Sequence, residues 1–141
     1  MVAGIKQPMR ISQSLIDEMV AHAQEEDPNE CCGLVGGHDG KATTVYRARN
    51  EFASPLRYKI HTGDQLRIQE KEMRGAGEDV VGIYHSHTRS AAYPSQTDLN
   101  EAVAWPEPMY IIVSLQNADV PVVKGFWLRD NKIVDAEIDI A

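Results

Sequence analysis

The distribution of apolar and polar positions predicts strands interrupted by a few amphipathic helices. Short apolar runs bounded by Gly, Pro or Asn are typical of strands, whereas apolar residues three and four apart are typical of helices. We predict strands over about residues 9–12, 31–37, 41–49, 80–84, 110–115, 122–128 and 134–140, an extended segment over 57–60, and helices over about 12–27, 62–74 and 95–104. This order predicts an α/β domain with a mixed central β-sheet and about three flanking helices.

Two of these elements carry more specific expectations. Thr62 and Gln65 have the spacing of a capping box, which predicts that Thr62 caps the second helix. Every second residue from Val134 to Ile140 is apolar, and the residues between them are acidic. This alternation predicts one continuous last strand with a single solvated face.

The overall composition narrows the class of protein. A length of 141 residues predicts one domain over residues 1–141, and 43% hydrophobic with 25% charged residues is ordinary for a globular protein. The net charge of -7 disfavours nucleic acid and anionic membranes as partners. No signal peptide or membrane span is visible, and the adjacent Cys31 and Cys32 cannot link distant segments, so we expect a cytoplasmic protein.

Two histidines at the end of a predicted strand provide the candidate chemistry. His85 and His87 are two residues apart, so their side chains leave the strand on the same face. Asp98 follows eleven residues after His87, close enough in sequence to return to the same point. Two imidazoles and one carboxylate, completed by a water, are a plausible ligand set for a divalent metal such as catalytic zinc.

Each of these residues also has a simpler explanation. Ser95 followed by Asp98 is what the start of a helix requires, and one aspartate cannot easily give its best oxygen to both a cap and a metal. Glu30 before a strand is usually solvated, although hydrolysis by a metal-activated water needs a carboxylate to carry the proton. Cys31 and Cys32 lie on opposite faces of a strand, where buried small side chains are the default.

The combined pattern resembles a known family. Glu30, His85-Ser86-His87, seven residues, Ser95, two residues and Asp98 match the E…HxHx7SxxD signature of the JAMM (MPN-plus) metalloproteases without a mismatch. The chain is most similar to the small prokaryotic branch, with its Mec-type sulfur-carrier peptidases and archaeal desampylases. The resemblance implies a single cytidine-deaminase-like MPN domain. It also implies one Zn²⁺ per chain, held by His85, His87 and Asp98.

The resemblance also implies an activity and a partner. Glu30 would take a proton from the attacking water and return it to the leaving amine, and Ser95 would hydrogen-bond the oxyanion. The substrate would be the bond after the Gly-Gly-type tail of a small ubiquitin-like sulfur-carrier protein. We expect the residues beside the tail to be Arg57, Tyr58, Thr88 and Arg89.

Alternatives to this activity remain open. A non-catalytic MPN-type scaffold would have lost ligands, and this chain has lost none. A zinc deaminase would need an H-x-E motif and a Cys-x-x-Cys pair, both of which are missing. The sequence does not decide between a peptide and an isopeptide substrate, and a homodimer is possible.

Overall fold

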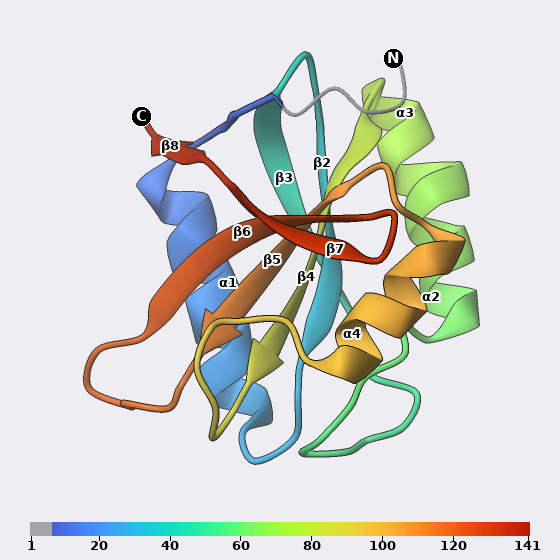
Figure 1. Ribbon diagram of the computed structural model, residues 1–141. Helices are drawn as coiled ribbons and strands as arrows, with labels where there is room; N and C mark the ends of the chain where they lie inside the picture. The colour runs from blue at the N-terminus through green and yellow to red at the C-terminus, as the bar shows by residue number, and fades with distance from the viewer. Residues whose placement is uncertain (1–6) are drawn as a thin grey trace.

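The computed structural model describes residues 7–141 and has a curved mixed sheet at its centre (Figure 1). The sheet has the order β7-β6-β5-β4-β2-β3-β1-β8. Its strands are β1 (Met9–Ile11), β2 (Cys32–His38), β3 (Lys41–Ala48), β4 (Asp79–His87), β5 (Met109–Ser114), β6 (Val122–Arg129), β7 (Lys132–Ala136) and β8 (Ile138–Ile140). The pairs β4–β5, β1–β3 and β1–β8 are parallel and the others antiparallel, so the predicted mixed α/β sheet is confirmed.

Helices cover both faces of the sheet and create two separate cores. Helix α1 (Gln13–Glu26) packs on one face, and α2 (Thr62–Arg67) and α4 (Gln96–Glu101) lie on the other (Figure 1). Along β5, Ile111 and Val113 belong to the first core, whereas Tyr110 and Ile112 belong to the second. Burial on both faces explains why β5 is apolar without alternation from Met109 to Val113.

The second predicted helix begins and continues differently from the expectation. Its N-cap is His61, whose Nδ1 accepts the backbone N–H of Asp64 at 3.2 Å, so the prediction that Thr62 caps it is wrong. After α2 the helix continues as a π-helical segment, Ile68–Met73, and a last turn, α3 (Arg74–Ala76), that ends at Gly77 with a φ of 68°. The wider π turn lets two residues five apart, Ile68 and Met73, both enter the core.

The C-terminal strand is not continuous, which corrects the prediction for residues 134–140. β7 pairs with β6 at one edge of the sheet, and β8 pairs with β1 at the opposite edge. The chain changes edge at Glu137, whose carbonyl accepts the N–H of Met9 at 3.0 Å. The sheet therefore curves until its two edges meet, and the interruption leaves Val134 and Ile140 exposed instead of buried.

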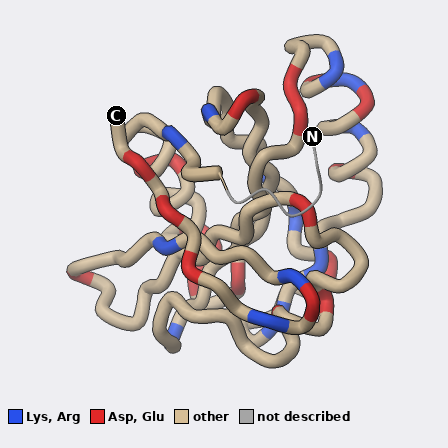
Figure 2. Tube along the Cα trace, turned by 45° about the horizontal axis from the view of Figure 1, so that its top comes forward, with Lys and Arg blue, Asp and Glu red and all other residues tan. Residues whose placement is uncertain are grey.

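Charged residues follow the same C-terminal segment. Asp135 in β7, Glu137 between the strands and Asp139 in β8 follow one another at every second position. Lys and Arg positions are scattered over several elements (Figure 2). Among residues 7–141, none of the helices has the length and apolar character needed to cross a membrane.

Candidate metal centre and active site

The three predicted ligands lie together at the carboxyl end of β4. His85 and His87 leave the same face of this strand, and Asp98 reaches them from the first turn of α4. The Nε2 atoms of the two histidines are 3.2 Å apart. Oδ2 of Asp98 lies 3.2 Å from Nε2 of His85 and 3.0 Å from Nε2 of His87. All three side chains are buried, so one enclosed point is surrounded by three ligand atoms.

This arrangement fits a tetrahedral metal ion. Ligands about 2.0–2.1 Å from a zinc ion occupy corners roughly 3.3 Å apart, close to the three separations found here. His87 must donate from Nδ1 to the carbonyl of Ala91 at 2.9 Å, because a carbonyl only accepts, so in the neutral imidazole Nε2 is the nitrogen with the free lone pair. Burial by itself would raise the pKa of Asp98, but the imidazoles of His85 and His87 hold that pKa well below its usual range. A cation bound between the three atoms would be held by all of them.

Ser95 and Asp98 form a capping box at the start of α4 that shares an atom with the ligand set. The Oγ of Ser95 accepts the N–H of Asp98 at 3.0 Å, and the N–H of Ser95 donates to Oδ2 of Asp98 at 2.9 Å. The same oxygen, Oδ2, faces both the cap and the two histidines, and a carboxylate oxygen has two lone pairs with which it could serve a cap and a metal together. Ser95 accepts in the cap and keeps its own hydroxyl proton free to donate.

Glu30 is a buried carboxylic acid beside this cluster. Cys31 exchanges hydrogen bonds with Ser86 of β4, so Glu30 enters just beyond that point, near His87. Only 5% of the residue is exposed, and Oε1 has no hydrogen-bond partner among the described residues. Burial raises the pKa of Glu30 to about 7, where the group can both accept and return a proton at neutral pH.

Residues 12–129 match the family described as prokaryotic homologs of the JAB domain. The chain belongs to this family. The JAB-domain protein is 32% identical over 132 residues to the CysO-cysteine peptidase of Mycobacterium tuberculosis, an alignment that covers 92% of this chain and 89% of the relative. It is 38% identical over 106 residues to the desampylase of Haloferax volcanii, which covers 70% of this chain and 74% of that relative.

A solved structure supports the same assignment. The solution structure of a protein from Desulfitobacterium hafniense superimposes with a TM-score of 0.84 at 33% identity, covering 94% of this chain and 92% of the other. The JAB-domain protein is accordingly a peptidase of the JAMM type, in agreement with the family that the sequence motif predicts.

The four predicted substrate-binding residues of the JAB-domain protein occupy different environments. The Tyr58 ring stacks on His85, one of the proposed ligands. Arg57 is exposed, with its guanidinium over the Phe52 ring at 4.2 Å, and Arg89 is also exposed. Thr88 is buried and offers little surface to a substrate. A substrate role for these four residues stays a prediction.

Both cysteines of the JAB-domain protein, and a third buried histidine, His22, lie outside the ligand set. Cys31 and Cys32 belong to the two different cores, and burial raises the pKa of Cys31 to about 12, so that thiol stays protonated. Neither belongs to the group of residues placed to hold a metal among the described residues. His22 is buried on the α1 side, where its Nδ1 hydrogen-bonds the hydroxyl of Tyr84 at 2.7 Å.

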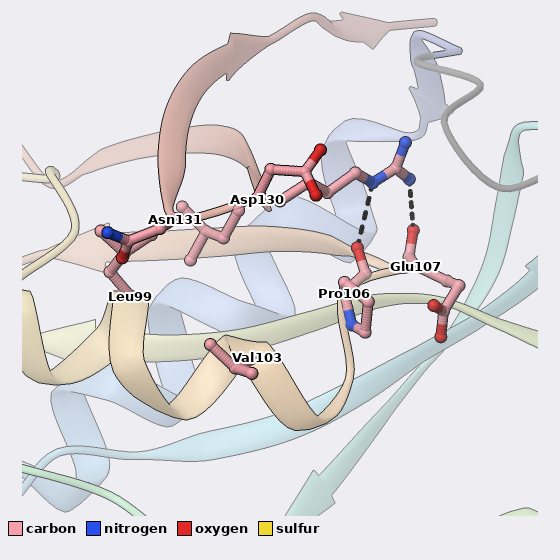
Figure 3. A pocket seen from close by; sticks show the side chains of 8 residues that line it. Leu99, Val103, Pro106, Glu107, Asp130 and Asn131 are labelled. Carbon is pink, nitrogen blue, oxygen red and sulfur yellow. Dashed lines mark hydrogen bonds between the residues drawn. The ribbon is translucent and has the colours of Figure 1, made fainter.

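A surface cavity of about 460 Å³ lies between α4 and the turn that joins β6 to β7 (Figure 3). Leu99 and Val103 line it from the helix and its following turn. Arg129 closes one end, because its guanidinium donates to the carbonyls of Pro106 at 3.1 Å and Glu107 at 2.8 Å. This cavity holds none of the predicted catalytic or ligand residues.

One residue near the site has no counterpart in the sequence-based prediction. Asn50 follows β3 and uses its side-chain amide for four hydrogen bonds, one of them to Glu30. An Asn at the start of a loop is a recognised turn signal, but the partners of its amide are set by the tertiary fold.

Proposed function

We propose that this JAB-domain protein is a zinc-dependent peptidase. Its substrate would be the bond after the C-terminal Gly-Gly-type tail of a small ubiquitin-like sulfur-carrier protein. The observation that carries the proposal is the triangle of ligand atoms from His85, His87 and Asp98, with sides of 3.0–3.2 Å, beside the buried carboxyl group of Glu30. One Zn²⁺ per chain fits this set.

The residues divide the work of hydrolysis between them. A bound zinc ion lowers the pKa of a water to roughly 7 and polarises the scissile carbonyl. Glu30 accepts a proton from the water as the C–O bond forms, which leaves an oxyanion on the former carbonyl. Glu30 then passes the proton to the amine as the oxyanion collapses and the C–N bond breaks. The hydroxyl of Ser95 donates a hydrogen bond to the oxyanion, an interaction worth on the order of 3 kcal/mol. The products are the carboxylate of the tail and a free amine.

The names of relatives support the substrate class. One relative is named for cleaving CysO-cysteine, one as a desampylase, and a Thermus thermophilus relative as a probable TtuB-protein conjugate cleaving protease. A tail without bulky side chains suits a narrow site that reads main-chain groups. The alternative, a non-catalytic scaffold, is disfavoured because every ligand and proton carrier is retained.

A paired substrate assay tests this proposal. Wild type and Glu30→Gln are incubated with a carrier protein extended by cysteine after Gly-Gly, and with the same tail joined to a lysine side chain. Mass spectrometry then measures the released carrier. We expect wild type with one zinc per chain to cleave at least one tail, and E30Q to bind the same zinc without turnover.

Two results would each reject one part of the proposal, the role of Glu30 or the class of substrate. Wild-type cleavage rates in E30Q would reject the role of Glu30. Absence of cleavage of both tails by the zinc-loaded wild type would reject the carrier substrate. The preferred tail decides between a peptidase and an isopeptidase.

A further inference from the structure

Asn50 stands at the base of a loop that borders the candidate site. The 50–60 loop, residues 50–60, is closed by a bridge between Asn50 and Ile60. Oδ1 of Asn50 accepts the N–H groups of Phe52 and Lys59, each at 3.1 Å. Nδ2 donates to the carbonyls of Arg57 and Glu30, also at 3.1 Å each. One side chain therefore both shapes the loop and ties it to Glu30.

The backbone of Glu30 is held by this loop on both sides. Its N–H donates to the carbonyl of Ser54 at 2.9 Å, and its carbonyl accepts from Asn50. Its side-chain Oε1, in contrast, has no hydrogen-bond partner in the part of the chain that the structure describes. Among the described residues, the hydrogen bonds that hold Glu30 in this loop are therefore those of its backbone.

The same loop also contacts His85, one of the three proposed metal ligands. Tyr58, two residues before Ile60, stacks on the imidazole of His85 with ring centroids 4.2 Å apart. The loop that Asn50 holds together therefore makes two contacts with the site. One is the bond from Asn50 to Glu30, the proposed proton carrier, and the other is the stacking of Tyr58 on His85, a proposed ligand.

We propose that Asn50 is a positioning residue for hydrolysis, which holds Glu30 at the distance and angle that proton transfer requires. The proposal rests on the function proposed above. Proton transfer between a water and a leaving nitrogen depends on geometry, and a misplacement of about 1 Å can cost on the order of 100-fold in rate. Losing the tether moves Glu30 without removing any metal ligand.

Two substitutions at Asn50 separate the bonds that its amide donates from the bonds that it accepts. Asn50→Asp keeps an oxygen that accepts from Phe52 and Lys59 but cannot donate to the carbonyls of Glu30 and Arg57, whereas Asn50→Ala removes all four bonds. We expect kcat to fall about 10- to 100-fold in both variants, with KM within about twofold of wild type and zinc content unchanged. Glu51→Gln is the control, because it removes the ion pair with Lys59 in the same loop and leaves in place the bonds of the Glu30 backbone to Ser54 and Asn50.

Turnover of N50D within about twofold of wild type would overturn the proposal, because the donors to Glu30 would then be dispensable. An equal loss in E51Q would also overturn it, since any disturbance of the loop would then suffice. A loss confined to N50D and N50A supports it.

Hydrogen exchange keeps the proposal testable if wild type cleaves no carrier tail, the outcome that rejects the proposed function instead. We expect the Glu30 amide to exchange at least tenfold faster in N50D than in wild type, a loss of about 1.4 kcal/mol of protection. The Cys31 amide, which donates to Oγ of Ser86 at 2.8 Å, should keep its protection as the internal control. Unchanged exchange at Glu30 would overturn the proposal independently of activity.

Discussion

The ring of Tyr58 lies nearly parallel to the imidazole of His85, with centroids 4.2 Å apart and planes inclined by 19°. Nδ1 of His85 is buried and has no hydrogen-bond partner among the described residues, whereas Nδ1 of His87 donates to Ala91. Metal-binding histidines are usually oriented by a hydrogen bond from their second nitrogen. Stacking against Tyr58 supplies the corresponding constraint for His85.

Replacing Tyr58 therefore should change metal affinity. We expect Tyr58→Phe, which keeps the stacked ring, to retain wild-type zinc affinity. Tyr58→Ala should bind zinc about 10- to 100-fold more weakly, the usual effect of removing a group that orients a ligand. Competition with a chromophoric chelator measures both. Equal affinities of Y58A and wild type would show that the stacking does not orient His85.

Ser95 combines a structural role with a proposed catalytic one, and substitutions separate them. Ser95→Ala should lose about 1 kcal/mol of stability with the cap. It should also lose on the order of 100- to 1,000-fold in kcat with the oxyanion donor. Ser95→Asp still accepts the N–H of Asp98 but has no proton to donate, so it should recover stability without turnover, and Ser95→Thr should recover both. Denaturant unfolding and kcat are the two measurements, and full activity in S95D would remove Ser95 from the mechanism.

His22 should make the stability depend on pH. Burial, assisted by the positive charge of Arg47, lowers the pKa of His22 to about 4 from an ordinary value of 6.5. Between pH 6.5 and 4, His22 binds a proton in the unfolded chain but not in the folded protein. His22 therefore does not reduce the free energy of unfolding above pH 6.5, and it reduces it increasingly as the pH falls below that value. The loss from this group approaches about 3 kcal/mol at the acidic end.

His22→Gln isolates this contribution, because glutamine does not titrate and can still hydrogen-bond the hydroxyl of Tyr84. We expect urea unfolding of H22Q to show a shallower decline between pH 6.5 and 4 than wild type. Parallel stability curves for the two proteins would mean that His22 is not kept neutral by burial.

Local patterns predict most of the fold because each strand and helix buries one or two faces. The apolar run of β5 and the helical spacing in α1 are read directly from the sequence, and both elements form where expected. The pattern misleads at residues 134–140, where period-two alternation is present but the chain crosses from one edge of the sheet to the other at Glu137. The alternation of apolar and polar residues shows which face of a strand is exposed to solvent. It does not show at which edge of the sheet the strand pairs.

The sequence by itself determined the chemistry that is available: two histidines on one strand face, an aspartate in the first turn of the next helix, and a distant glutamate. These follow from the period of a strand and from motif spacing. Only the tertiary structure decided that Oδ2 of Asp98 serves cap and cluster together, and that Glu30 is buried and tied to Asn50. The reason is that such contacts depend on the register between β2 and β4, where Cys32 pairs with His85, and on the path of the 50–60 loop. Register and loop path are set by the packing of the whole sheet, so residues far apart in the chain meet only once it has formed.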